Sequence, residues 1–400
     1  MTPRRNSGIA DRVAALRPLA LAELLLIGRQ HGAVDLATGS PSFPDCGADL
    51  LGLASEALRG GNNQYADPAG SRELRAAAAT LHGADPDTEI TITAGATEGL
   101  AVTLQALVQP GDEVVVIEPY FEAYVPAIRL AGAQPRFVRL REPGWRWDPV
   151  ELAAAFGPRT RAVIVNSPHN PTGRVFTASE LSQVTRLCAT WDSTLISDEV
   201  YVEFTDVPGA AVLPGAVEPA ARVVALRSLS KSHAVSGWRI GWIYAPAELT
   251  RVFRMVHEVL VVGCAAPLQV AAAETLRTRP GWSGPERSAL IQKRKRVHAA
   301  AAAAGLTGDL PRGSAYLFLR LPPGAPPAND LARRLAIDCR LLTASGSLFF
   351  ADPAAGRAYL RLACNKSDEV LDAAVERLAV AAPVLNAAAL SAVSPRLEES

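Results

Sequence analysis

The segment Ser228-Leu-Ser-Lys-Ser-His-Ala-Val-Ser-Gly-Trp-Arg239 holds the residues whose types and spacing are best suited to chemistry. Lys231 stands between small hydroxyl residues just after a short apolar run, and Arg239 follows eight positions later. A lysine amine can form an imine with a carbonyl compound, and hydroxyl groups with an arginine suit a phosphate. A solvated loop lysine is the alternative, but these neighbours favour an imine-forming lysine beside a phosphate site.

Four other motifs accompany this segment, each at the end of an expected strand or turn. They are Asn62-Asn-Gln-Tyr65 with Gly70 beyond it, Thr93-Ala-Gly-Ala-Thr-Glu-Gly99, Asn166-Ser-Pro-His-Asn-Pro-Thr-Gly173 and Ser197-Asp-Glu-Val-Tyr201. Each motif alone is a weak signal, but their order along the chain makes a strong one.

With the lysine segment, these motifs resemble the class I/II aminotransferases of fold type I, in order over roughly residues 33–380. The resemblance implies an enzyme that carries pyridoxal 5′-phosphate (PLP). It also implies that the amino group of an L-amino acid passes to a 2-oxo acid by a ping-pong mechanism through a Schiff base on Lys231. The expected substrates are therefore amino acids and 2-oxo acids.

The elements that must position these motifs follow an α/β rhythm from about residue 46 to 280. Short apolar runs alternate with helical patterns, and several runs lack polar alternation, as expected where helices cover both faces of a parallel sheet. The resemblance implies the same fold, a large domain with a mostly parallel central sheet flanked by helices plus a smaller α+β domain. The expected strands are Ile90–Thr93, Glu113–Ile117, Ala162–Val165, Thr194–Ser197, Val223–Leu226 and Ile240–Tyr244.

A break in the pattern near Pro280 and Pro285 indicates a second domain. A helix is expected over Glu286–Ala304, ended by Gly305, with later strands at Ala315–Leu321 and Ala358–Leu362. The predicted division is an N-terminal arm and part of the small domain (1–45), a large PLP-binding domain (46–285), a small domain (286–385) and a loose tail (386–400).

The resemblance implies that three residues besides Lys231 contact the ring of the cofactor. Asp198 would hold the pyridine nitrogen protonated, because an opposite charge favours the charged form. Asn170 and Tyr201 would donate hydrogen bonds to the phenolate oxygen. The alternatives are a helix N-cap for Asp198, a plain turn for Asn170 and a core position for Tyr201.

The phosphate of the cofactor is expected at a helix N-terminus, where free N–H groups and the helix dipole converge. Gly95-Ala96-Thr97 would supply such amides and a hydroxyl, and Ser228, Ser230 and Arg239 would complete the site. The alternative for Gly95 is helix–strand packing. Tyr65 matches a tyrosine that reaches the phosphate of the neighbouring subunit, which implies a homodimer.

The remaining site residues concern the ring face and the substrate. Phe121 falls where the family places an aromatic ring on the pyridine face, although a core role is the alternative. Arg361 resembles the arginine that binds the substrate α-carboxylate, with Arg357 as its rival, because a guanidinium fork matches two carboxylate oxygens. Gly39 matches an amide donor to the same carboxylate, or forms a mere turn, and Asn170 is expected to contact the substrate as well.

Three departures from the family pattern lie where substrate preference could be set. Pro41-Ser-Phe43 occurs where the family usually has Pro-Asp-Phe. His233 replaces the usual phenylalanine, and Ser345-Gly346 replaces Pro-Gly. His233 is not expected to be a general base, since Lys231 is already placed for proton transfer. No departure removes a catalytic atom.

Composition excludes several classes of protein. The 400 residues carry 40 basic and 40 acidic side chains, so no net field attracts nucleic acid or an anionic membrane. Five cysteines without metal-ligand spacing favour a reducing, cytoplasmic setting and no metal site. We expect neither a signal peptide nor a membrane anchor.

Two alternative functions stay open at this point. Another PLP enzyme on the same scaffold, such as a β-lyase, an amino-acid cyclase or a tailoring enzyme of specialised metabolism, would share the cofactor motifs. A ligand-sensing regulator is disfavoured, because only about 35 residues precede the first glycine motif and such regulators carry an added DNA-binding domain.

Overall fold

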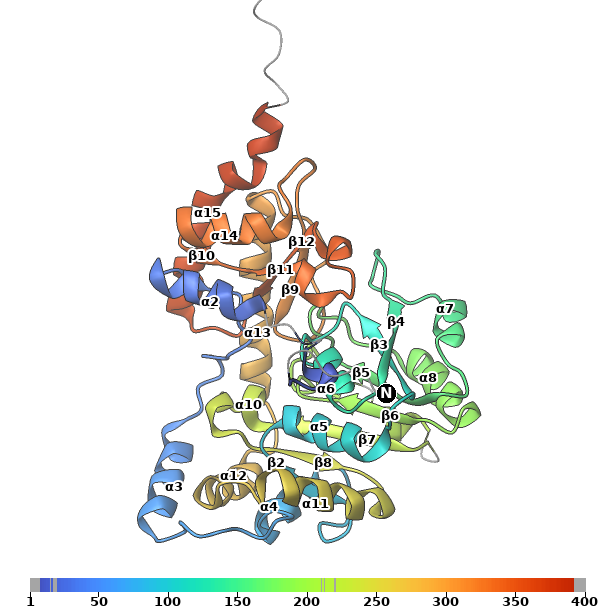
Figure 1. Ribbon diagram of the computed structural model, residues 1–400. Helices are drawn as coiled ribbons and strands as arrows, with labels where there is room; N and C mark the ends of the chain where they lie inside the picture. The colour runs from blue at the N-terminus through green and yellow to red at the C-terminus, as the bar shows by residue number, and fades with distance from the viewer. Residues whose placement is uncertain are drawn as a thin grey trace, which may run out of the picture.

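The computed structural model describes residues 8–14, 16, 20–209, 211, 213–218 and 221–391. Its largest element is a seven-stranded sheet with the order β2-β8-β7-β6-β5-β3-β4 (Figure 1). β8 is antiparallel to both of its neighbours, and the other pairings are parallel. The strands are β2 (Ile90–Thr93), β3 (Glu113–Glu118), β4 (Gln134–Arg139), β5 (Thr160–Asn166), β6 (Thr194–Asp198), β7 (Val223–Ser228) and β8 (Gly241–Tyr244).

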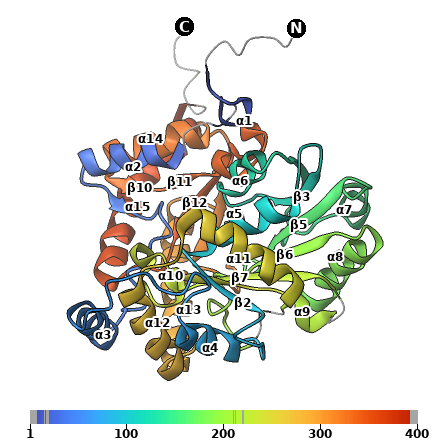
Figure 2. The ribbon, with the colours of Figure 1, turned by 60° about the horizontal axis from the view of Figure 1, so that its bottom comes forward.

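Helices cover both faces of this sheet, as its apolar strands require. Alternate residues of β5 belong to different core clusters: Val163 packs with Leu181 of α8 (Ala178–Thr190). Ile164 belongs to the cluster that includes Leu104 of α5 (Ala96–Leu107) and Phe253 of α11 (Ala247–Val261). Figure 2 shows α11 lying across the strands. The predicted α/β fold with a mostly parallel sheet is confirmed.

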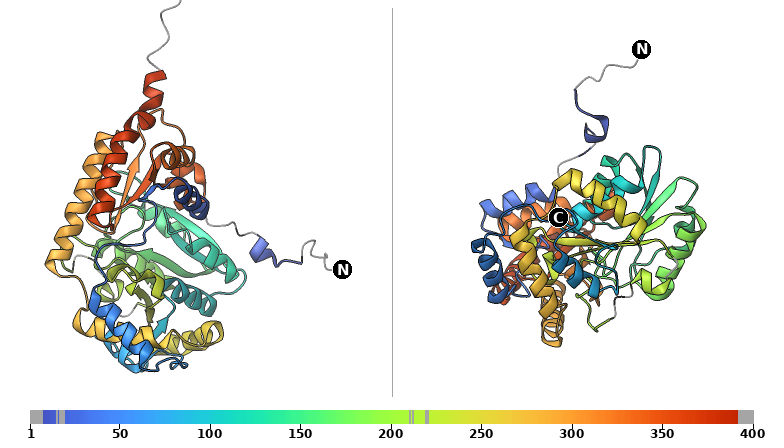
Figure 3. Two further views of the ribbon diagram at one scale, coloured as in Figure 1. Left: turned by 90° about the vertical axis from the view of Figure 1, so that its left-hand side faces the viewer. Right: turned by 90° about the horizontal axis from the view of Figure 1, so that it is seen from below.

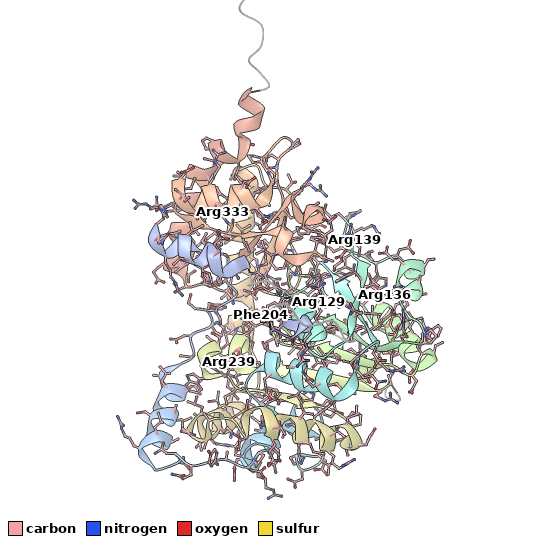
Figure 4. All side chains as sticks on the ribbon, viewed as in Figure 1. Arg129, Arg136, Arg139, Phe204, Arg239 and Arg333 are labelled. Atoms are coloured by element: carbon pink, nitrogen blue, oxygen red, sulfur yellow. The ribbon has the colours of Figure 1, made fainter. Side chains whose placement is uncertain are left out.

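The expected strands all form, with ends that differ by at most two residues from those observed. The sequence analysis missed β4, which lies at the edge of the sheet beside β3. Its Gln134 and Arg136 are exposed, and Figure 4 shows Arg136 and Arg139 on this strand. An edge strand with a solvated side lacks the continuous apolar run that marks the buried strands.

A smaller sheet is built from the C-terminal third of the chain. β12 (Tyr359–Ala363) pairs antiparallel with β9 (Tyr316–Arg320) and with β11 (Ala344–Ser345). β1 (Val34–Asp35) pairs with β10 (Leu341–Leu342), so the N-terminal residues join this part of the molecule. The domain boundaries given above stay a prediction.

Four of the described helices pack around the strands of this part of the molecule. They are α13 (Gly284–Ala303), α14 (Ala328–Asp338), α15 (Asp368–Ser391) and α2 (Ala20–Gln30). α13 packs along α15, as Figure 3 shows. The predicted helix over Glu286–Ala304 corresponds to α13, and Gly305 beyond it has a φ of 100°.

The first residues of the predicted tail are helical, because α15 continues to Ser391. The segment Asn386-Ala-Ala-Ala-Leu-Ser is alanine-rich, so helix propensity outweighs its lost apolar periodicity. Residues 392–400 of the expected tail and residues 1–7 of the expected arm lie outside the described residues.

The other helices connect the strands or cover the ends of the large sheet. Within the described ranges, no helix is both long and apolar enough to cross a membrane. The five cysteines are free thiols. The remaining helices are α1 (Asp11–Ala14), α3 (Ala48–Arg59), α4 (Arg72–Thr80), α6 (Tyr124–Leu130), α7 (Pro149–Ala154), α9 (Pro214–Val217), α10 (Leu229–Ser232) and α12 (Ala266–Thr278), with 3-10 turns at Ser236–Trp238, Gly346–Phe349 and Pro353–Gly356.

Candidate active site

A cavity opens where the parallel strands end. β5 ends at Asn166, β6 at Asp198 and β7 at Ser228, and ligands of open α/β sheets bind at this carboxyl edge. All but two of the expected site residues line this one cavity: Gly39, Ala96, Thr97, Phe121, Asn170, Asp198, Tyr201, Ser228, Ser230, Lys231, Arg239 and Arg361. Gly95 and Tyr65 are not among its lining residues.

Lys231 lies on α10, the single helical turn directly after β7. Its Nζ donates a hydrogen bond to the carbonyl oxygen of Gly39 at 2.9 Å. Burial, together with the nearby cations Arg361, Lys366 and Arg239, lowers the pKa of Lys231 to about 8, and the charge of Asp198 acts in the opposite direction. A lysine with this pKa is partly uncharged near neutral pH, which imine formation requires.

Asp198 is the last residue of β6 and is buried. The Tyr124 hydroxyl donates to Asp198 Oδ2, and the Val200 N–H donates to Oδ1. Burial raises the pKa of Asp198 to about 6, against which these hydrogen bonds act. Within the described part of the chain, no cation forms an ion pair with this carboxylate. A protonated pyridine nitrogen would supply the missing positive charge, so the site fits PLP in this respect.

Tyr201 and Asn170 present donors to the same cavity. The hydroxyls of Tyr201 and Tyr316 are 2.7 Å apart, and burial raises the pKa of Tyr201 well above its usual range. Tyr201 therefore stays a protonated donor. The Asn170 N–H bonds to Asn166 Oδ1 at 2.7 Å, and Asn170 Oδ1 accepts from Arg361, which leaves its amide NH₂ to donate elsewhere.

The N-terminus of α5 forms the second end of the cavity. Gly95 is its N-cap, with φ 81° and ψ 168°, a conformation that is essentially restricted to glycine. A Cβ at Gly95 would lie 2.5 Å from Nη2 of Arg239, so glycine also lets this guanidinium approach. The first amides of a helix lack intrahelical acceptors and attract anions.

Two serines and Arg239 complete the anion-binding set. Ser228 Oγ lies 2.7 Å from Ser230 Oγ, and Arg239 holds its own side chain by donating to the carbonyls of Ser236 at 2.8 Å and Ala94 at 3.1 Å. Amides, hydroxyls and a guanidinium thus converge, which is the donor set that a phosphate needs.

Arg361 lies on β12 and is buried between two aromatic rings, with its guanidinium carbon 4.3 Å from the Tyr316 ring centre and 4.7 Å from that of Phe349. Nη1 donates to Asn170 Oδ1 at 2.9 Å, and Nη2 donates to the Ala37 carbonyl. Its Nε is buried and has no hydrogen-bond partner among the described residues. The rival Arg357 is exposed and does not line the cavity, so the geometry favours Arg361 as the carboxylate ligand.

Gly39 lies where a side chain has no room, because a Cβ would fall 1.8 Å from the Tyr316 hydroxyl. Asn365 and Lys366, which follow β12, hold the loop that carries Gly39. Asn365 Nδ2 donates to the Gly39 carbonyl at 3.2 Å, and Lys366 Nζ donates to the Ser40 carbonyl at 2.9 Å. Lys366 is also 3.6 Å from Asp35.

Sequence reasoning gave no role to Tyr124, Tyr316, Lys366 or Glu122. Tyr124 lies three residues after Phe121, and Lys366 lies five after Arg361, so proximity to assigned residues was the available signal. Their partners come from other elements, which the sequence alone does not bring together.

The other expected residues lie as follows. Phe121 packs edge-on against Tyr124, with ring centres 5.6 Å apart. Tyr65 is 87% exposed and lies outside the cavity of its own chain. His233 is buried beside Ser232 and the carbonyl of Arg279, and burial lowers its pKa to about 4. A histidine so placed, outside the cavity lining, is not a general base for this site.

Known proteins are similar to this chain in both sequence and fold. Residues 32–378 match the family model of aminotransferase class I and II. The probable N-succinyldiaminopimelate aminotransferase DapC of Mycobacterium tuberculosis is 35% identical over 392 residues, which cover 92% of this chain and 98% of that protein. Methionine aminotransferase of Escherichia coli (strain K12) is 37% identical over 268 residues, or 64% of this chain and 68% of that protein.

Solved structures agree with this similarity. The N-succinyldiaminopimelate aminotransferase of Mycobacterium tuberculosis superposes with a TM-score of 0.88 at 32% identity, covering 93% of this chain and 99% of that one. A double mutant of Thermus thermophilus aspartate aminotransferase gives a TM-score of 0.85 at 31% identity, with coverage of 93% and 99%. The chain therefore belongs to the class I and II aminotransferase family and is a PLP-dependent aminotransferase of fold type I.

Proposed function

We propose that Lys231 is the residue that binds PLP as a Schiff base, and that the site transfers the amino group of an L-amino acid to a 2-oxo acid by a ping-pong mechanism. One observation carries the proposal: a lysine whose pKa is lowered to about 8 shares a cavity with the buried carboxylate of Asp198, which forms no ion pair with any described cation. Lys366 is the other lysine nearby, but it is tied to Asp35, Thr38 and Ser40 and does not line the cavity.

The residues around Lys231 would hold the cofactor by its three polar ends. Asp198 holds the pyridine nitrogen in its protonated form, and Tyr201 and Asn170 donate to the phenolate oxygen. When bound, PLP supplies an electron sink for the negative charge that develops at the Cα of the substrate. Phe121 is expected to cover one face of the ring.

The phosphate end is assigned to the donors at the start of α5 and after β7. These are the amides of Gly95, Ala96 and Thr97, the Thr97 hydroxyl, Ser228, Ser230 and Arg239. Arg239 and the N-terminus of α5 would attract the negative phosphate and so hold the cofactor beside Lys231.

Arg361 and the Gly39 amide are assigned to the α-carboxylate of the substrate. A carboxylate there would satisfy the buried Nε of Arg361, which has no hydrogen-bond partner among the described residues. With the carboxylate held, the Cα–H of the substrate would lie toward Lys231. The uncharged Nζ of Lys231 would be the base that takes the proton from Cα.

The half-reaction tests this function against other PLP chemistry. Enzyme mixed with an amino donor alone should release about one equivalent of 2-oxo acid per site and then stop, because the amino group stays on the enzyme. A 2-oxo acid added next should restart turnover. Steady release of ammonia without an acceptor would instead indicate an eliminating enzyme and overturn the proposal.

Lys231→Ala should abolish this half-reaction, whereas Lys366→Ala is the matched control. The control removes a lysine of the same neighbourhood that does not line the cavity. It should retain the bound cofactor and still complete the half-reaction at a high concentration of donor, because Lys366 positions only the loop that carries Gly39. Loss of the half-reaction in both variants, with the fold intact, would contradict the proposal that Lys231 alone binds PLP.

We also propose a cytoplasmic homodimer in which Tyr65 reaches the phosphate of the partner's site. The support is that Tyr65 is exposed in its own chain, as are Val259, Leu260 and Met255 of α11. Apolar side chains gathered in this way favour a protein interface. Sedimentation of the holoenzyme tests the dimer.

Mixed dimers test the reach of Tyr65. Lys231→Ala and Tyr65→Phe chains, refolded together in equal amounts, would place both lesions in one site and leave the other intact. About one quarter of all sites would then recover wild-type activity. If Tyr65 serves its own chain, each mixed-dimer site keeps one lesion and no recovery follows.

A further inference from the structure

The charged groups of the cavity leave one carboxylate without a role. Three cations line it, and the proposed function uses all of them: Lys231, Arg239 and Arg361. Of the two lining carboxylates, Asp198 is assigned to the cofactor. The other is Glu122, which lies between Phe121 and the start of α6.

Glu122 has no ion-pair partner among the described residues, although the charge of Arg361 acts on it. Among the described residues, its carboxylate forms neither a hydrogen bond nor an ion pair. Burial raises its pKa, and the positive charge of Arg361 acts in the opposite direction. A partly buried carboxylate without a partner is costly unless a ligand supplies one.

The surrounding cations do not fill this need. Glu122 also lines the adjoining cavity, together with Arg129 and Arg333, both labelled in Figure 4. Arg333 pairs with Glu23 at 2.6 Å, and Arg129, which is exposed on α6, forms neither a hydrogen bond nor an ion pair with Glu122. Glu122 thus lines both cavities, and no cation among the described residues is paired with its carboxylate.

We propose that Glu122 is a specificity-determining residue that selects amino donors whose side chain ends in an ammonium or guanidinium group. The inference rests on the proposed function, in which Arg361 fixes the α-carboxylate. From that fixed end, Leu21, Leu348 and Phe121 offer apolar walls of the same cavity to the methylene stem of the donor. Glu122 then receives the terminal cation, whereas an acidic side chain meets a like charge.

Pairs of donors that differ only in the terminal group test this selection. L-arginine is compared with L-citrulline, and L-lysine with L-norleucine. A site with a placed polar partner discriminates more strongly than an apolar pocket, so kcat/KM should favour the cationic member by about tenfold or more. Glu122→Gln should reduce that ratio to within about twofold of unity and change the neutral donors little.

Glu23→Gln is the matched control, because it removes a carboxylate of the adjoining cavity that is already paired with Arg333. It should leave the preference for cationic donors unchanged. A readout independent of turnover is the binding of 5-guanidinopentanoate and 5-ureidopentanoate, which lack the α-amino group and cannot react. Calorimetry on the holoenzymes should show tighter binding of the guanidino acid to wild type, and no preference in Glu122→Gln.

The outcomes separate this inference from the function on which it rests. If neutral donors transfer their amino groups as well as the cationic ones, or if Glu122→Gln lowers kcat/KM equally for both, the selection by Glu122 is wrong and the aminotransferase reaction stands. If no amino acid of either kind enters the half-reaction, both fail together. A retained visible absorbance in Glu122→Gln shows that the variant is folded and loaded.

Discussion

Replacing Asp198 with asparagine should make the apoenzyme more stable and the cofactor less tightly bound. The amide has nearly the shape of the carboxyl group: its oxygen can accept the hydrogen bond of the Val200 N–H, and its NH₂ group can donate to the Tyr124 hydroxyl, which turns from donor to acceptor. What it lacks is the negative charge, which is buried with no cation paired to it in the described chain. The substitution therefore isolates the cost of that charge.

The magnitude follows from the pKa of Asp198. Burial raises it from 3.8 to about 6, a shift of about 2 pKa units, and each unit corresponds to about 1.4 kcal/mol. The charged form thus costs the folded apoenzyme on the order of 3 kcal/mol. Because the folded protein binds more protons than the unfolded chain between about pH 4 and 6, stability falls as pH rises through this window and the cost is constant above it.

The cofactor reverses the sign of this effect. A protonated ring nitrogen against Asp198 turns the unpaired charge into a paired one, so the carboxylate stabilises the holoenzyme. Asparagine removes that pairing. Removing one partner of a buried ion pair typically costs about 3 kcal/mol, which corresponds to roughly 100-fold weaker binding of PLP.

Two measurements on wild type and Asp198→Asn decide the matter. Urea unfolding of the apoenzymes should show a higher midpoint for the variant at pH 8 and nearly equal midpoints at pH 4, and fluorescence titration should show the weaker binding of PLP. An apo variant that is no more stable than wild type at pH 8 would refute the reasoning, because the buried charge would then carry no cost.

Other predictions follow from neighbouring contacts. Arg361→Lys should lower kcat/KM for amino donors by roughly 100-fold, since a lost charge-assisted bond to a carboxylate is worth about 3 kcal/mol. A change below threefold would show that Arg361 does not bind the α-carboxylate. Gly95→Ala should raise the dissociation constant of PLP about tenfold or more, because its backbone conformation costs a non-glycine residue about 1–3 kcal/mol and the new Cβ displaces Arg239; unchanged binding in a titration would contradict this. The rate at which apoenzyme incorporates PLP should rise with pH and level off above about pH 8, since the Lys231 amine is uncharged above its lowered pKa; a rise centred near 10.5, the ordinary value, would show that burial has no effect. Lys366→Met should raise the KM for amino donors more than it lowers kcat, because it releases the loop that holds Gly39; a fall in kcat alone would argue against a positioning role.

The sequence predicted the large sheet and the shared location of Asp198, Tyr201 and Lys231 for one physical reason. Buried parallel strands appear as continuous apolar runs, and their carboxyl ends meet at one edge. Motifs that follow such runs therefore come together even when they are far apart in the chain. The same logic failed for the edge strand at Gln134–Arg139, where one side faces solvent.

Contacts between distant elements could not be predicted in this way. The hydroxyl pair of Tyr201 and Tyr316 joins residues 115 positions apart, and Lys366 reaches the loop at Ser40 from the other end of the chain. Nor did the spacing show that Glu122 lacks a partner, since that depends on which side chains surround it. Such features depend on packing, which a single sequence does not display.

The central claim is that Lys231 holds the cofactor, and reductive labelling tests it most directly. Borohydride reduction of the holoenzyme should bleach its visible absorbance and fix one pyridoxyl group per chain. Peptide mass spectrometry should then find that group on Lys231, and Lys231→Ala should take up no label at this position. Label on Lys366 or another lysine, or holoenzyme that resists reduction, would contradict the account.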